Sequence, residues 1–386
     1  MAVMKAISKL FSILHQWQAG GGLALELSIQ SPSDREHNFK NLYFGGDNEN
    51  GYPDIDCSGY PSAETPSATI HDPKHGWIDG VQVHAPREGA ILRIFEPTRL
   101  RNTANLPLVP AVTKFVLRRQ CRRQIEPKTL GHLLSKLPRL ESLIYEPWQQ
   151  WSKGEQKSRD EKGYCGLIRL HLPSTVKRVS LFEETSKPYA KILSLCTPSF
   201  GRPRVAPTPV SSAVANRSLN LEHLSAAFIV EARDFFISCQ PSWFWEHLQS
   251  LALTSDTLSR KANLKDVLSL LQNAAKAALS MPRLHTLTLW NTSQGEACKF
   301  SYHVNPAVVT WRGTWDLKLD SCTIQDWTKV ARKQGQHDLQ VKRELLSTHV
   351  NSQGHAVELL DLPCGVVDPG SLWQMRREMV SGWQGR

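Results

Sequence analysis

The fold of this 386-residue chain is decided by the stretch Met281-Pro-Arg-Leu-His-Thr-Leu-Thr-Leu289. Three apolar residues, Leu284, Leu287 and Leu289, stand there with two variable residues in the first interval and one in the second. The stretch Leu137-Pro-Arg-Leu-Glu-Ser-Leu-Ile-Tyr145 repeats this order. Apolar residues at helical spacing precede both stretches, at 130–137 and 264–278, so a helix, a proline and a strand are predicted twice in the same order.

Further copies of this strand motif begin at Val112, Val176, Leu221, Leu248 and Val357, and a weaker copy lies at Trp315-Asp-Leu317-Lys-Leu319. The motif is typical of leucine-rich repeats, whose short strands stack on a shared core and leave an open concave face. We therefore expect an α/β fold, an irregular leucine-rich-repeat-like solenoid with a curved, mainly parallel strand face and outer helices. Steps of 28 residues (Val112 to Leu140) and 27 residues (Leu221 to Leu248) suit a regular repeat, whereas the longer steps require insertions. An ordinary α/β or α+β domain is the alternative.

The side chains between the leucines are expected to line the concave face, because side chains alternate across a strand. We predict that a protein partner binds there. The candidate contacts are Arg178, Phe182, His223, Thr288, Trp290 and Lys318. Trp290 is the preferred anchor, since exposed indoles contribute strongly to binding; the alternative is that the chain turns after Leu289 and buries Trp290. The residues expected in the core are Leu140, Leu143, Leu251, Leu253, Leu287 and Leu289.

Three regions are expected along the chain. Residues 1–44 form a helix-strand unit that has the character of a truncated repeat, 45–88 form a low-order insertion rich in Gly, Asp, Asn, Pro and Ser, and 89–386 form the repeat domain. A mitochondrial presequence is an alternative interpretation of the first helix. The chain has no apolar run of about 18 residues, so no membrane span is expected. Its widely spaced cysteines suit the cytoplasm or the nucleus.

The search for catalytic chemistry argues against an enzyme. The common nucleotide-binding, hydrolase and zinc-protease motifs do not occur in the sequence. His71 and His75 have a ligand-like spacing near Cys57, but Pro73 separates them and we interpret them as surface residues. We interpret Glu183-Glu184 as solvated surface. No catalytic residue, metal site or cofactor is expected, and an enzyme of unrecognised type is kept as an alternative.

The positive charge provides a second alternative. The formal net charge is +10, and Arg118, Arg119, Arg122 and Arg123 follow directly on the strand motif at Val112–Leu117. Four guanidinium groups in six residues suit phosphate binding or nuclear import. No aromatic residues alternate with these arginines, so base stacking has no support. We expect these arginines to pair with acidic residues such as Glu126 or Glu146, and we favour a protein partner over nucleic acid.

Longer stretches resemble a known family. These are residues 112–124, 137–148, 171–176, 219–224, 251–255, 310–317 and 371–378. Together they resemble a family of uncharacterised fungal proteins whose longer members look like F-box proteins followed by leucine-rich repeats. The resemblance implies a substrate-recognition subunit of a ubiquitin ligase, or a truncated relative, and supplies no catalytic residues. The segment before Ala19 is too short for an F-box, so a ligase adaptor is expected as a partner only if an upstream F-box exists.

Overall fold

The computed structural model describes residues 2–42, 70–98, 100, 103–183, 185–197, 200, 204–293 and 295–381. The chain forms two compact units. Unit 1 contains Met1–Pro173, Glu183–Arg204 and Val367–Arg386, and unit 2 contains Ser174–Phe182 and Val205–Val366. The fold is mixed α/β with mostly parallel strand pairing, as the sequence predicted at this coarse level.

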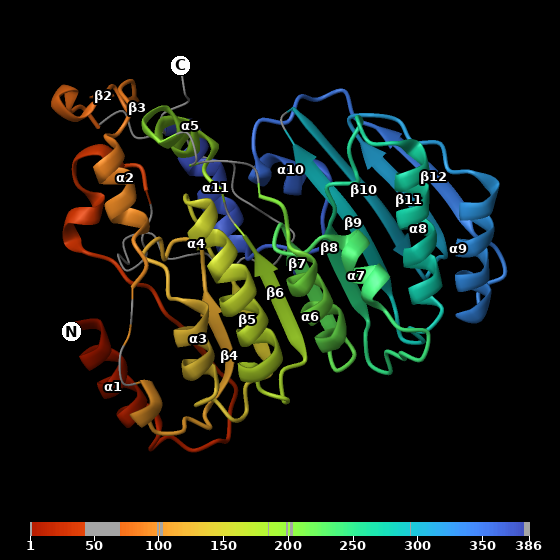
Figure 1. Ribbon diagram of the computed structural model, residues 1–386, viewed down its shortest axis with the longest axis horizontal. Helices are drawn as coiled ribbons and strands as arrows, with labels where there is room; N and C mark the ends of the chain where they lie inside the picture. Colours follow the sequence, from red (N-terminus) through yellow and green to blue (C-terminus); the bar gives the residue numbers. More distant parts are fainter. Residues whose placement is uncertain are drawn as a thin grey trace. The chain divides into compact units, whose positions relative to one another are not determined.

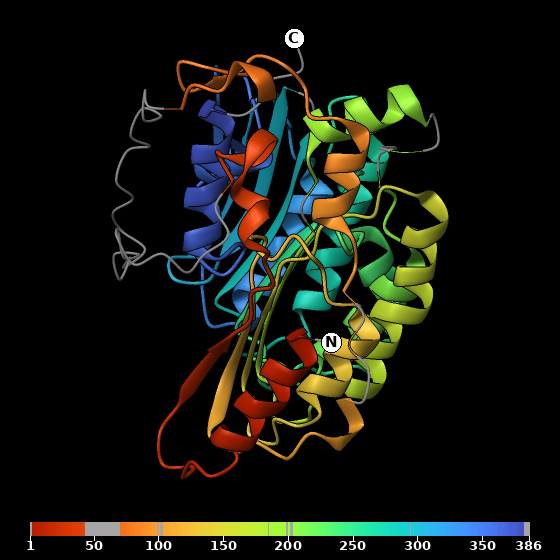
Figure 2. The ribbon, with the colours of Figure 1, turned by 90° about the vertical axis from the view of Figure 1, so that its left-hand side faces the viewer.

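Unit 1 is built on three parallel strands in the order β1 (Leu23–Glu26), β4 (Val112–Leu117) and β5 (Ser142–Tyr145). Its helices are α1 (Ala2–Leu14), α2 (Glu88–Phe95), α3 (Pro127–Leu134), α4 (Lys153–Ser158), α5 (Lys187–Cys196) and α11 (Pro369–Ser381). Shorter 3-10 turns lie at Pro32–Arg35, His37–Phe39, Pro73–His75 and Thr103–Asn105, and π-helical turns at Arg159–Tyr164 and Leu167–His171. Figure 2 shows β1 beside β4, with α3 on one side of them.

The predicted helices of unit 1 are confirmed, and local chemistry explains where they lie. Pro127 stands in the first turn of α3, where a missing N–H costs no hydrogen bond. The predicted stripe Leu130, Leu133 and Leu134 is fully buried. In α1 the buried residues are Ile7, Phe11 and Leu14, which follow helical spacing.

The expected low-order insertion is corrected over its second half, whereas residues 45–69 lie outside the described residues. Residues 70–88 form a 3-10 turn and the short hairpin β2 (Trp77–Ile78) and β3 (Val81–Gln82). The Trp77 indole is fully buried, and its N–H donates to the His37 carbonyl at 2.9 Å. Trp77 therefore helps to anchor this polar segment, together with Gln82, which donates to the Asn38 carbonyl at 2.7 Å.

Unit 2 begins with parallel strands in the order β6–β7–β8–β9 and continues through antiparallel β9–β10–β11 to β12, which is parallel to β11. The strands are β6 (Arg178–Phe182), β7 (His223–Ala227), β8 (Ser250–Thr254), β9 (Thr286–Ser293), β10 (Glu296–His303), β11 (Val308–Gly313) and β12 (Gln340–Leu345). The helices are α6 (Thr208–Ser218), α7 (Ala232–Ser238), α8 (Leu264–Ala278), α9 (Ser321–Lys333) and α10 (Gln353–Leu359). Helices α6 to α9 follow one another along one face of these strands (Figure 1).

The strand motifs at Val112, Leu140, Val176, Leu221, Leu248 and Leu284 are confirmed as strands β4 to β9. All six predicted core leucines are buried; Leu140 and Leu143 belong to unit 1, and Leu251, Leu253, Leu287 and Leu289 belong to unit 2. Two other copies of the motif were wrong. The Val357 copy begins inside α10, which starts where the Ser352 hydroxyl accepts the His355 N–H at 2.9 Å. The Trp315–Leu319 copy is a loop that leads to α9.

Within the described residues, none of the helices combines the length and the hydropathy that a membrane crossing requires.

Candidate functional site

The predicted partner-binding stripe separates into buried and accessible residues in unit 2. Phe182, Thr288 and Trp290 are buried. Arg178 and Lys318 are exposed and His223 is half-buried. Arg178 and His223 are paired in register at the start of β6 and β7. Burial and the neighbouring Arg178 charge lower the pKa of His223. These two residues stay predicted partner contacts, whereas Lys318 lies on the loop before α9.

Trp290 is a core residue, which corrects the prediction that it stands on an open face. Its ring meets Phe228 at 5.2 Å, and Phe228 meets Phe182 at 5.5 Å, both edge to face. The segment after β12 covers the Trp290 side of the sheet. Lys299, the register partner of Trp290, donates from Nζ to the Asp361 carbonyl at 2.7 Å. The sequence motif does not show this covering segment, because its polar contacts use backbone carbonyls.

The basic stretch Arg118–Arg123 is an internal ion-pair cluster of unit 1. Arg119 and Arg122 are 3% and 1% exposed, and both bind the Glu378 carboxylate of α11, Arg119 at 2.9 Å. Arg118 Nε lies 3.0 Å from Asp368 Oδ1. The remaining residue of the set, Arg123, makes a two-pronged contact with Asp34 at 2.6 and 2.9 Å. The guanidinium groups that the nucleic-acid alternative would use for phosphate are therefore paired with carboxylates of the same chain.

Glu146 is buried beside this cluster. It accepts backbone N–H groups from Arg119 at 3.2 Å and from Asp368 at 2.7 Å, and the Ser371 hydroxyl also donates to it. Burial, reinforced by the Asp368 carboxylate, raises the pKa of Glu146 to about 7. Burial alone would raise the pKa of Glu378, but Arg119 and Arg122 outweigh it and hold that pKa below its ordinary value. These contacts hold α11 in place through Glu378 and Ser371.

A second polar cluster in unit 1 corrects the interpretation of Glu183 as solvated surface. The Glu183 side chain is 2% exposed and lies 2.6 Å from Arg204 Nε. Arg204 also binds both carboxylate oxygens of Asp160, at 3.0 and 2.8 Å. Glu184 lies outside the described residues.

The two histidines that had metal-like spacing bind different carboxylates. His71 Nδ1 lies 3.2 Å from Asp79, and His75 Nδ1 lies 2.8 Å from Asp72. Cys57 falls outside the described residues. Among the residues that the structure describes, no group of three or more His, Cys, Asp or Glu side chains could hold a metal ion.

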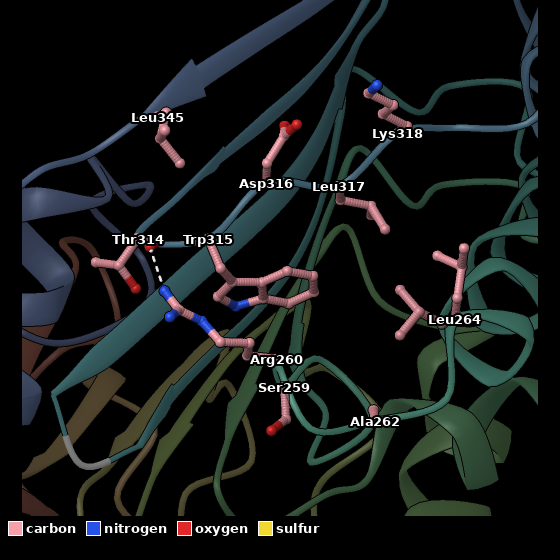
Figure 3. A pocket seen from close by; sticks show the side chains of 11 residues that line it. Ser259, Arg260, Ala262, Leu264, Thr314, Trp315, Asp316, Leu317, Lys318 and Leu345 are labelled. Carbon is pink, nitrogen blue, oxygen red and sulfur yellow. Dashed lines mark hydrogen bonds between the residues drawn. The ribbon is translucent and has the colours of Figure 1, made fainter.

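Unit 2 contains a groove, which we call the α8–β12 groove (Figure 3). Its volume is about 660 Å³. The lining residues are Ser259, Arg260, Ala262, Leu264, Val267, Thr314, Trp315, Asp316, Leu317, Lys318 and Leu345. Leu264 at the start of α8 is 53% exposed and Leu345 at the end of β12 is 69% exposed. Figure 3 shows the Trp315 ring between these two leucines.

The walls of the groove are fixed by polar contacts. Arg260 donates to the Thr314 carbonyl at 2.8 Å and pairs with Glu296 at 3.1 Å. The Trp315 carbonyl accepts the Trp311 indole N–H at 2.9 Å, which holds the loop against β11. Asp316 pairs with Arg343 of β12 at 3.2 Å. Of the groove residues, only Lys318 was predicted from the sequence as a partner contact. The sequence offered one further signal for an exposed apolar residue: Leu264 directly follows the cap residue Asn263, so no earlier helical turn covers it.

The comparisons with known proteins place these features in a family. A family model described as "Family of unknown function (DUF6546)" matches residues 171–368, which is about half of the chain. The chain belongs to the DUF6546 family. The DUF6546 match includes the α8–β12 groove, β12 and the covering segment with α10. No curated protein and no solved structure matches the chain.

Proposed function

We propose that this DUF6546 chain is a protein-interaction scaffold and that the α8–β12 groove is its docking site. The observation that carries the proposal is the pair of exposed side chains Leu264 and Leu345 on either side of Trp315. Exposed apolar side chains that line a groove with a polar rim are typical of binding sites. A tryptophan in such a groove is the kind of residue that dominates binding energy.

The charges on the rim indicate the chemistry of the partner. Lys318 is exposed, and no carboxylate among the described residues pairs with it. Arg260 is 57% exposed although it pairs with Glu296. A partner segment with a large apolar side chain and an adjacent carboxylate would cover the leucines and neutralise Lys318.

The finer interpretation is a fungal F-box-like protein with an irregular leucine-rich-repeat solenoid, in the cytoplasm or the nucleus. Its support is the sequence resemblance together with the parallel strands β4–β5 and β6–β9. Under this interpretation the bound segment belongs to a ubiquitin-ligase substrate. A version of the protein that carries an F-box would then co-purify with a ligase adaptor, and affinity purification with mass spectrometry tests that.

The docking proposal is tested with a phage-displayed library of random peptides. We expect the full chain to enrich peptides that carry a large apolar residue next to Asp or Glu. The enriched peptide, synthesised with a fluorescent label, is then titrated by anisotropy. Leu264→Asp should weaken its binding at least about ten-fold, because it removes an apolar contact and adds a charge.

Leu195→Asp is the matched control. Leu195 is 79% exposed on α5 of unit 1 and does not line the groove. This variant should bind the peptide as the unmodified chain does. Failure to enrich any peptide, or equal affinity of the Leu264→Asp and Leu195→Asp proteins, would overturn the docking site.

A further inference from the structure

Strand β12 is an edge strand with unusual exposure. All of its residues, Gln340–Leu345, are exposed, on both faces of the strand. β12 pairs with β11 on one side only, and none of the described strands lies on the other. The Gln340 N–H donates to Ala307 at 3.0 Å and the Leu346 N–H donates to Gly313 at 2.8 Å. Even-numbered residues therefore face β11, and Val341, Arg343 and Leu345 direct their backbone N–H and C=O groups outward.

The side chains of β12 divide into two kinds. Val341 and Leu345 are 42% and 69% exposed and project from the same side of the strand as Arg343. Lys342 and Glu344 project from the other side. Long edge strands with exposed apolar residues invite pairing with another strand, so the order of charges decides which strand fits.

The sequence of β12 is complementary to itself in one antiparallel register. Only the outward-facing residues can exchange backbone hydrogen bonds, so the two-fold axis of an antiparallel pair passes through one residue of β12. An axis at Lys342 or Glu344 would place that residue opposite its own copy, with like charges together. With the axis at Arg343, Val341 lies opposite Leu345 of the second copy, and Lys342 lies opposite its Glu344. The symmetry makes each of these pairs twice. An axis at Val341 or Leu345 would keep one apolar pair, of that residue with its own copy, but Lys342 would no longer lie opposite Glu344 and the charge pairing would be lost.

We propose that two copies of this chain form a homodimer by antiparallel pairing of β12 with β12, centred on Arg343. The two Arg343 side chains are then neighbours, but each lies 3.2 Å from Asp316 of its own chain, which offsets their repulsion. The dimer covers Val341 and Leu345 and satisfies the outward backbone groups. Leu345 also lines the α8–β12 groove, so the dimer would use one wall of that groove, whereas the test of the dimer needs no peptide.

Sedimentation velocity on charge variants tests the dimer. Lys342→Glu and Glu344→Lys should each weaken it roughly 10- to 100-fold, because two attractive cross-strand pairs become repulsive. An equimolar mixture of the two variants should form a heterodimer, since every cross-strand pair is again of opposite charge. The double variant K342E/E344K should self-associate like the unmodified chain. This recovery separates the cross-strand pairs from the intrachain Glu344–Arg312 contact of 2.8 Å, which Glu344→Lys also removes.

The backbone is tested by Arg343→Pro with Arg343→Ala as its control. Proline removes an outward N–H and leaves the hydrogen bonds to β11 in place, so dimerisation should be lost while circular dichroism is unchanged. Alanine keeps the N–H and should keep the dimer. A monomeric unmodified chain, a dimer that none of the charge variants weakens, or a variant mixture that stays monomeric would each overturn the proposal. A foreign strand as the natural occupant would give the first of these results.

Discussion

At the residue scale, the buried side chains determine which sequence predictions succeed. Leu287 and Leu289 are buried as their motif requires, whereas their neighbours Thr288 and Trp290 are buried as well. Strand alternation shows which residues share a face, but not whether that face is covered. Here Lys299 and Arg312 attach the covering segment through the carbonyls of Asp361 and Leu359, and a backbone carbonyl leaves no trace in a sequence motif.

Trp290→Ala should destabilise the protein by about 3 to 5 kcal/mol, because it leaves a large cavity beside Phe228. Urea denaturation followed by circular dichroism measures this change. Trp17→Ala is the control: Trp17 is 51% exposed, and its replacement should change the free energy of unfolding by less than about 0.5 kcal/mol. Equal stability of the two variants would show that Trp290 is accessible, as the sequence alone suggested.

Glu146 should make stability depend on pH. Its folded pKa of about 7 lies above the ordinary value of 4.5, so the folded state binds more protons between these pH values. The resulting stability is complete below pH 4.5 and is lost as the pH rises through 7. Between pH 5 and pH 8, the unmodified chain should therefore lose roughly 2 to 3 kcal/mol of unfolding free energy through this group. Glu146→Gln should lack this part of the pH dependence. Identical slopes would mean that Glu146 stays ionised throughout.

The Arg122–Glu378 contact should be a stability determinant. Arg122→Met leaves Glu378 with Arg119 as its remaining partner in a buried site, so we expect a loss of about 3 kcal/mol. The double variant R122M/E378Q should lose less than the sum of the single losses, since neither charge is then left uncompensated. If the losses of unfolding free energy of the two single variants simply added in the double variant, the contact between Arg122 and Glu378 would be contradicted. A salt-dependent affinity for duplex DNA that disappears in folded Arg122→Met would instead support the nucleic-acid alternative.

At the element scale, six copies of the leucine motif and the helix-strand unit at the start of the chain were predictable, whereas β10, β11 and β12 were not. β4 to β9 follow from apolar spacing, and α3 and α8 follow from their stripes and their first-turn residues. β10, β11 and β12 lack the motif, and their pairing depends on tight contacts between neighbouring strands. The Val357 copy of the motif shows the reverse case, because the spacing i, i+3 suits a helix as well as a strand.

The β10–β11 contact can be tested at Gly313. A Cβ added there would lie 2.8 Å from the Cβ of Cys298 and 3.0 Å from the Ala297 carbonyl oxygen. Gly313→Ala should therefore cost about 1 to 3 kcal/mol of stability. Gly89→Ala is the matched control, because a Cβ at Gly89 in α2 has nothing within 4 Å and alanine favours a helix by about 0.5 to 1 kcal/mol. The midpoint temperature of thermal unfolding should fall for Gly313→Ala and rise for Gly89→Ala. A shift of both midpoints in the same direction would contradict the packing of β10 on β11.

At the scale of the whole molecule, the sequence predicted the α/β class but not the segments that form the groove. The docking groove combines the start of α8, the loop after β11 and the end of β12, and these segments come together only through the pairing of β11 with β12. Lys318 was predicted as a partner contact because it was placed on a strand, whereas it lies on the loop before α9. Leu264 and Leu345 could not be selected, because an apolar residue in a sequence is expected to be buried until its surroundings are known.

Binding of a protein partner at the α8–β12 groove is best tested by site-specific photo-crosslinking in cells. A photoreactive benzoylphenylalanine is placed at position 264 of the full chain, and at exposed position 195 as the control. We expect a discrete crosslinked product from position 264 that contains one partner protein and that is missing from position 195. No product from position 264, or the same products from both positions, would overturn the docking site.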